Sequence, residues 1–313
     1  MTDFILHHYP PSPVSQKVRS AFGMKQAHWQ SVVQNRLPDR PELFAMTGGF
    51  RRIPVLQIGA DIYCDTQMIL AEIDRRMPDP PLYPPEASGA TMGIAQWTDG
   101  PLFQLAVRLA FAPVADQAPP ELVADRARLY LGPNGDFRKE AADLPHTLAQ
   151  VRAQLGWLET RFANGPAFML GDAATHADLS AWYLLWFIRG RYADAQTLLG
   201  EFPNLNAWSD RMAALGEGTS TDMSPADALA VAVKTEPVTA EGDDPRDCQG
   251  LKPGDAVTVT PATDSGDPAV AGIVRCVTVT ASRSCARRRR PVACASISQG
   301  SGTALRLIGE TKP

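Results

Sequence analysis

The chain has 313 residues, of which 44% are hydrophobic and 20% are charged, and its formal net charge is -4. This length accommodates two domains with sizeable cores, and the composition is typical of a soluble globular protein. The negative charge argues against nucleic acid or an anionic membrane as the main partner. No apolar stretch reaches membrane-spanning length and no charged start precedes an apolar run, so we expect a cytoplasmic protein. The five cysteines are scattered without metal-ligand spacing, so neither a disulfide framework nor a metal site is predicted.

Residues 1–77 alternate strand and helix signals, which predicts a mixed sheet with covering helices. The first strand is a short apolar segment at 4–9, and a helix signal follows it. Residues 52–66 then predict a strand, a turn containing glycine, a second strand, and an acid-hydroxyl pair that opens the next helix. A proline-rich linker is expected at 78–86, because proline donates no N–H and fixes its own backbone.

Residues 87–215 predict an all-helical second domain, with Leu102, Leu105 and Leu109 spaced by three and four residues. Within it, Thr175 and Asp178 have the spacing of a capping box, in which each residue satisfies the backbone of the other. This pair is predicted to be structural, and His176 beside it is expected to be exposed.

The composition becomes polar beyond residue 215. We expect a linker with a short helix at 216–246, the helix running over 225–234 after Ser224 as its cap. Residues 247–313 predict a β-rich extension with strands near 251–260 and 269–279 and an irregular tail after Ala281. Because two or three strands alone are marginally stable, we expect residues 1–215 to form the enzyme-like body without it.

The segment around Pro54 is suited to binding a peptide. Proline at the first position of a strand costs no ladder hydrogen bond, and the Ile53–Pro54 bond can be cis at little energy, which would turn the backbone groups of Ile53 outward. Asp65 at the following helix start is placed for an ammonium group, and the Thr66 hydroxyl with the unpaired N–H groups for a carboxylate. The alternative is an ordinary helix start made by the same two residues.

Together, Ile-Pro-Val-Leu, the hairpin and Asp-Thr resemble the glutathione-binding half of the cytosolic glutathione S-transferases, and the resemblance covers roughly residues 4–215. It implies a thioredoxin-like first domain, a helical second domain, glutathione as a substrate and a homodimer. By resemblance, Ile53, Pro54, Asp65 and Thr66 bind glutathione, although the family usually has serine where Thr66 stands. Arg52 matches the basic residue that reaches the glycine carboxylate, with the neighbouring Arg51 as an alternative.

In this family a hydroxyl or thiol after the first strand stabilises the glutathione thiolate, together with the N–H groups and dipole of the helix end. Ser12 aligns best with that position, which is similar to the zeta- and theta-like members. The structural alternative for Ser12 is a helix cap. Ser15 is the stronger cap candidate and an alternative hydroxyl, and Tyr9 is another.

The resemblance implies conjugation of glutathione thiolate to a small apolar electrophile. Serine cannot form a mixed disulfide, so thiol transfer is disfavoured. The second substrate is expected to face Ser12 against the helix that carries Trp97 and Phe103. Two other readings stay open: a non-catalytic scaffold whose extension recruits a protein partner, and a glutathione-dependent peroxidase or isomerase that needs the same thiolate.

Overall fold

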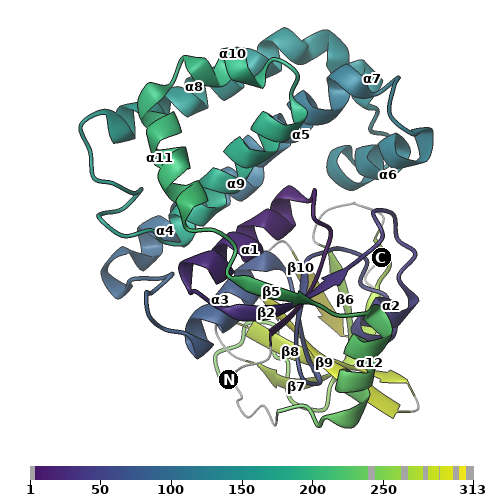
Figure 1. The fold of residues 1–313 in the computed structure, drawn as a ribbon. Coiled ribbons are helices and arrows are strands. Elements are labelled where there is room, and N and C mark those ends of the chain that lie inside the picture. The colour runs from purple at the N-terminus through teal and green to yellow at the C-terminus, as the bar shows by residue number, and fades with distance from the viewer. Residues whose placement is uncertain are drawn as a thin grey trace. The chain divides into compact units, whose positions relative to one another are not determined.

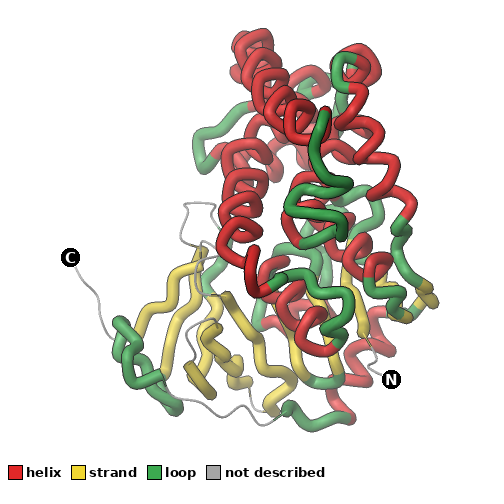
Figure 2. The backbone as a smooth tube through the Cα atoms, turned by 90° about the vertical axis from the view of Figure 1, so that its left-hand side faces the viewer, coloured by secondary structure: helices red, strands yellow, loops and turns green. Residues whose placement is uncertain are grey.

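The computed structural model describes residues 4–238, 244–261, 267–277, 281–288, 290–298 and 303–307. The chain forms two compact units, one comprising Met1–Ser15, His28–Glu72 and Thr219–Pro313 and the other Gln16–Ala27 and Ile73–Gly218. The described strands, yellow in Figure 2, belong to the first unit, whereas the second is built from helices, red in the same view. Within the described residues, no helix combines the length and apolar character needed to cross a membrane.

The first unit begins with a thioredoxin-like arrangement, as the sequence predicts. Strand β1 pairs in parallel with β2 and antiparallel with β3, and β3 pairs antiparallel with β4. The β3–β4 turn contains Gly59 at φ +61°, a backbone conformation that glycine adopts without steric cost. The elements are β1 (Phe4–His8), α1 (Pro13–Met24), β2 (His28–Val33), α2 (Pro41–Thr47), β3 (Val55–Ile58), β4 (Asp61–Cys64) and α3 (Thr66–Arg76).

The segment expected to be a linker carries two elements of this unit. Strand β5 (Thr219–Asp222) pairs in parallel with β2, and α12 (Pro225–Lys234) lies beside α2, as Figure 1 shows. The Ser224 hydroxyl accepts a hydrogen bond from the backbone N–H of Asp227 at 3.1 Å, which confirms the predicted cap and helix. Buried Ala228 packs with Ile5 and Val32, so α12 covers the apolar face of the first sheet.

The C-terminal residues extend the same sheet. The strand order is β10-β6-β7-β8-β9-β4-β3-β1-β2-β5, and β9 pairs in parallel with β4. Where the sequence predicts an irregular tail after Ala281, the described backbone forms strands, because β7 and its neighbours supply hydrogen-bond partners that no local pattern reveals. The bounds are β6 (Ala256–Pro261), β7 (Val270–Val277), β8 (Ala281–Arg288), β9 (Arg290–Ser298) and β10 (Thr303–Leu307).

The second unit is helical. A π-helical turn over Thr98–Leu102 joins α4 and α5, and α9 is buried around most of its circumference. Short 3₁₀ turns occupy Pro85–Ala87, Ala112–Val114 and Ala141–Asp143. The α-helices are α4 (Ser88–Trp97), α5 (Phe103–Phe111), α6 (Pro120–Leu131), α7 (Phe137–Glu140), α8 (Leu144–Ala163), α9 (His176–Arg191), α10 (Ala195–Gly200) and α11 (Pro203–Ala214).

The predicted capping box opens α9. The Asp178 carboxylate accepts hydrogen bonds from the Thr175 backbone N–H at 2.9 Å and from the Trp208 indole at 3.0 Å. Burial raises the pKa of Asp178, and these hydrogen bonds oppose that shift. The expectation for His176 is wrong: the side chain is fully buried, edge-on to the Tyr83 ring at 5.1 Å. Burial and the charge of Lys17 lower the pKa of His176 well below its usual value.

Candidate functional site

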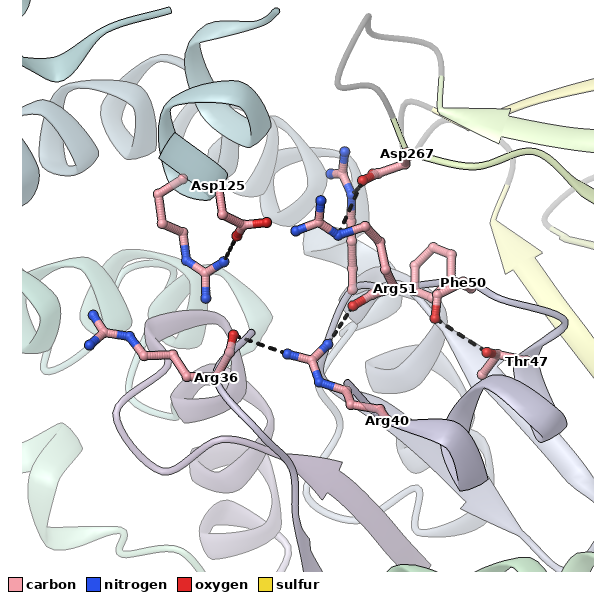
Figure 3. Close-up of polar contacts among 9 residues, drawn as sticks. Arg36, Arg40, Thr47, Phe50, Arg51, Asp125 and Asp267 are labelled. Carbon is pink, nitrogen blue, oxygen red and sulfur yellow. Dashed lines mark hydrogen bonds and ion pairs between the residues drawn. The ribbon is translucent and has the colours of Figure 1, made fainter. Parts of the chain in front are cut away.

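The loop that precedes β3 is fixed from two sides. Arg40, which is buried, donates hydrogen bonds to the carbonyl oxygen of Asn35 at 2.9 and 2.6 Å and to that of Arg51 at 2.5 Å. Figure 3 shows this contact, and also the Thr47 hydroxyl, which donates to the carbonyl oxygen of Phe50 at 3.2 Å. Helix α2 ends just before, at Gly48 in the left-handed conformation. The backbone leading into Ile53 is therefore held by two hydrogen-bonded side chains.

The Ile53–Pro54 peptide bond is cis, the isomer that the sequence analysis considers. Val55, the next residue, pairs with His7 of β1 and Cys64 of β4, so the sheet begins directly after the proline. Among the described residues, no hydrogen bond to the backbone of Ile53 is found. That backbone is thus available to an extended peptide.

Asp65 and Thr66 lie where β4 passes into α3. Asp65 has φ +77°, a conformation that few residues other than glycine adopt, and its carboxylate accepts a hydrogen bond from the Gln67 backbone N–H at 2.8 Å. Thr66 is the first residue of α3 and is buried, with 8% of its surface exposed. Burial, with a smaller effect of the Asp65 charge, raises the pKa of the adjacent Cys64 thiol. Cys64 is therefore not poised as a thiolate, and the candidate binding groups in this segment are the Asp65 carboxylate and the N-terminus of α3.

Ser12 directly precedes α1. Its hydroxyl oxygen accepts a hydrogen bond from the Ser15 backbone N–H at 3.2 Å, which is the contact that an N-cap side chain makes. The expectation that Ser15 is the stronger cap is therefore wrong, because Ser15 lies inside the helix, where its buried hydroxyl has no hydrogen-bond partner in the described part of the chain. Tyr9 ends the β1 region, half-buried, with the Arg36 guanidinium 5.9 Å from its ring centre.

The two candidate arginines are both engaged by one acid from the C-terminal extension. The Arg52 Nε lies 2.6 Å from the Asp267 Oδ2, and the Arg51 Nε lies 3.6 Å from the Oδ1 of the same carboxylate. Figure 3 places Asp267 beside Arg51. The Arg52 Nη2 is buried without a hydrogen-bond partner among the described residues. The structure therefore brings together the predicted basic residues and an acid that the sequence analysis does not identify.

The helical unit contains its own buried ionic contact. Lys17 lies 2.7 Å from Asp99, which the π-helical turn carries, and 5.1 Å from the centre of the Tyr183 ring. Burial raises the pKa of Tyr183 well above its usual value, and the Asp99 charge adds to the shift. Phe103, considered as a substrate contact, is packed against Tyr183 and Tyr130.

Other features of the described residues do not suggest a different site. No group of three or more histidine, cysteine, aspartate or glutamate side chains there is arranged to hold a metal ion. A hollow of about 380 Å³ in the helical unit is lined by residues from α9 to α11, including Arg189, Tyr192 and Asn206, and by none of the predicted site residues.

Comparison with known proteins supports the family that the sequence resembles. The model of the glutathione S-transferase N-terminal domain matches residues 6–81, and that of the C-terminal domain matches residues 136–211. These matches support the glutathione S-transferase family, and the fold is the one that this family has. No curated protein matches the chain.

Solved structures extend the likeness beyond these two regions. A GST-like protein from Pseudomonas syringae is 28% identical with a TM-score of 0.80, and the match covers 98% of this chain and 100% of that one. It therefore reaches into the C-terminal extension. Poplar glutathione transferase F1 is 14% identical with a TM-score of 0.53, covering 68% of this chain and 93% of that one. A tau class enzyme from mango, Mangifera indica, is 17% identical with a TM-score of 0.51, covering 68% and 89%. The last two show the fold alone.

Proposed function

We propose that the chain is a glutathione transferase that uses the first unit to bind glutathione and activate its thiol. The carrying observation is the geometry of Asp65, an acid at positive φ directly before the N-terminus of α3. Such strain is retained where the surrounding structure and function require it. There the carboxylate can pair with the ammonium of the γ-glutamyl group, while the N–H groups of the helix start and the Thr66 hydroxyl receive its carboxylate.

The cysteinyl and glycyl parts of glutathione would be bound by groups in the loop before β3. The backbone of Ile53, directly before cis-Pro54, makes no hydrogen bond among the described residues. It can therefore pair with the cysteinyl backbone of an extended ligand. Arg52 is the proposed contact for the glycine carboxylate, with Arg51 beside it. Each of these contacts matches one chemical group of glutathione, which is why this ligand is preferred over other peptides.

Ser12 is the proposed catalytic hydroxyl. As the cap of α1 it stands at the positive end of the helix dipole, where an anionic sulfur is stabilised. Its hydroxyl proton can point to the sulfur while its oxygen accepts the Ser15 N–H, because a hydroxyl donates and accepts at once. The thiolate then forms an S–C bond with a small apolar electrophile, and the leaving group departs with its bonding electrons.

The finer assignments also stay proposals. We propose a zeta- or theta-like relationship on the basis of Ser12, a homodimer as in the family, a cytoplasmic location, and neither nucleic acid nor a membrane as a partner. A steady-state assay with glutathione and an aryl halide tests the activity. Conjugation that depends on both enzyme and glutathione supports the proposal, whereas its absence over a panel of halides, epoxides and activated alkenes contradicts it.

A second candidate is a glutathione-fold scaffold whose extension recruits another protein. The observation that favours it is Asp267, which already neutralises the arginine proposed for the glycine carboxylate. Ligand binding distinguishes the two candidate functions. A scaffold whose arginines stay paired with Asp267 would not bind glutathione even at millimolar concentration.

A further inference from the structure

The C-terminal extension supplies an acid to the arginines that the proposed function assigns to the ligand. Asp267 precedes β7, 215 residues away from Arg52 in sequence, and its side chain is 5% exposed. Arg51 and Arg52 are its ion-pair partners at 3.6 and 2.6 Å. We propose that Asp267 is an internal competitor for the glycine carboxylate of glutathione, so that the extension sets the affinity and the carboxylate selectivity of the site. This inference rests on the proposed glutathione site.

The chemistry of the contact supports competition. A guanidinium that meets a peptide carboxylate binds best through two parallel N–H···O bonds. Asp267 instead approaches the Nε atom of each arginine, and the buried Nη2 of Arg52 keeps no partner among the described residues. The acid thus neutralises Arg52 without completing the hydrogen bonds of the Arg52 guanidinium, and a carboxylate that reaches both Nε and Nη2 would have the better geometry.

The exposure of the two arginines makes exchange of partners feasible. The Arg52 side chain is 39% exposed, whereas Arg51 is 15% exposed. The Arg52–Asp267 pair is therefore partly buried: its carboxylate and the Arg52 Nη2 are buried, whereas more than a third of the Arg52 side chain faces solvent and can be approached by a second carboxylate. A ligand carboxylate can therefore displace Asp267, and the displacement lowers the observed affinity instead of abolishing it.

The test compares two ligands that differ only at the glycine end. Glutathione and its glycyl monoethyl ester, which lacks that negative charge, are titrated by calorimetry into the full chain and into Asp267→Asn. We expect Asp267→Asn to bind glutathione about three- to tenfold more tightly, because the ligand carboxylate no longer has to displace an acid from the partly exposed Arg52 side chain. The affinity for the ester should be unchanged. Asp222→Asn, at an exposed aspartate of β5, is the matched control and should behave as the original chain.

Three outcomes overturn the inference. Equal or weaker glutathione binding by Asp267→Asn would mean that the acid supports the arginines instead of competing. An equal gain for the ester would mean that the effect does not involve the glycine carboxylate. Absence of glutathione binding to every form would instead reject the proposed function, and the inference with it. Asp267→Ser gives a second neutral variant, so that a folding defect of one does not prevent the comparison.

Discussion

The guanidinium of Arg40 donates a hydrogen bond of 2.5 Å to the carbonyl oxygen of Arg51, while the same guanidinium holds the carbonyl oxygen of Asn35. A single buried side chain thereby joins the loop after β2 to the loop before β3. The proposed glutathione contacts, Arg52, Ile53 and Pro54, are the next three residues after Arg51 in the sequence. Their placement depends on Arg40, which is not among the proposed ligand contacts.

Replacing Arg40 with lysine should weaken both stability and ligand binding. Lysine keeps the charge but cannot reach two carbonyl oxygens with a planar fork, so at least one of these carbonyl oxygens loses its donor. We expect the free energy of unfolding to fall by about 2 kcal/mol and glutathione affinity to fall as well. Chemical denaturation and calorimetry measure the two effects. Arg246→Lys, at an exposed position, is the control, and an unchanged affinity for Arg40→Lys would contradict the positioning role.

Asp65→Asn separates charge from capping. Asparagine tolerates the positive φ and can still accept the Gln67 N–H, so stability should be nearly retained. Loss of the negative charge should lower glutathione affinity about tenfold, since hydrogen bonds between charged groups are the stronger ones. Asp65→Ala should lose the same affinity and, in addition, about 1 kcal/mol of stability. Equal affinities for Asp65→Asn and the original chain would reduce Asp65 to a helix cap.

Ser12→Ala tests the thiolate. If Ser12 donates to the bound sulfur, its loss should raise the pKa of bound glutathione thiol and slow conjugation, with affinity nearly unchanged because the remaining contacts persist. Thiolate absorbance against pH measures the shift. Ser15→Ala is the matched control, since its buried hydroxyl makes no hydrogen bond in the described structure and should affect neither quantity. The same titration midpoint in Ser12→Ala as in the original chain would transfer the role to Tyr9 or Ser15.

The stability of the first unit should fall on acidification through a buried histidine. The His7 Nε2–H donates to Gln57 at 2.9 Å, and its Nδ1 accepts from Gln34 at 3.2 Å. Burial lowers the pKa of His7 from 6.5 to about 4, while the Gln57 contact opposes this. Between those two pH values the unfolded chain binds more protons, so stability decreases as pH falls, by roughly 3 kcal/mol in total for this group.

The comparison uses His7→Gln, which retains amide hydrogen bonding but does not titrate. Denaturation midpoints measured from pH 7 to pH 4 should fall less steeply in the variant than in the original chain. Identical slopes would show that His7 keeps its ordinary pKa in the folded protein.

Local sequence was sufficient to predict the hairpin, the helix start at Asp65 and Thr66 and the capping box at Thr175, and it allowed the cis isomer at Pro54 without requiring it. Each depends on residues within a few positions of one another, where turn and cap chemistry decide the conformation. The choice between Ser12 and Ser15 as cap failed because both have a suitable side chain, and only the helix register distinguishes them.

Long-range contacts could not be predicted in this way. Asp267 meets Arg52 across 215 positions, and no spacing rule links an acid in an extension to a loop in the first unit. His176 was expected to be exposed because its neighbours form a helix start, whereas packing against Tyr83 buries it. The strands after Ala281 form because they pair with other strands of the sheet. This pairing overrides the weak strand preference of the local sequence.

Calorimetric titration of the full chain with glutathione shows whether the first unit binds this ligand. We expect saturable binding of one glutathione per chain, weakened by Asp65→Asn and strengthened by Asp267→Asn, because the first variant removes a ligand contact and the second removes a competing acid. Saturable binding with these two opposite shifts would support the site as described. No measurable binding at millimolar glutathione, either to the original chain or to Asp267→Asn, would contradict it.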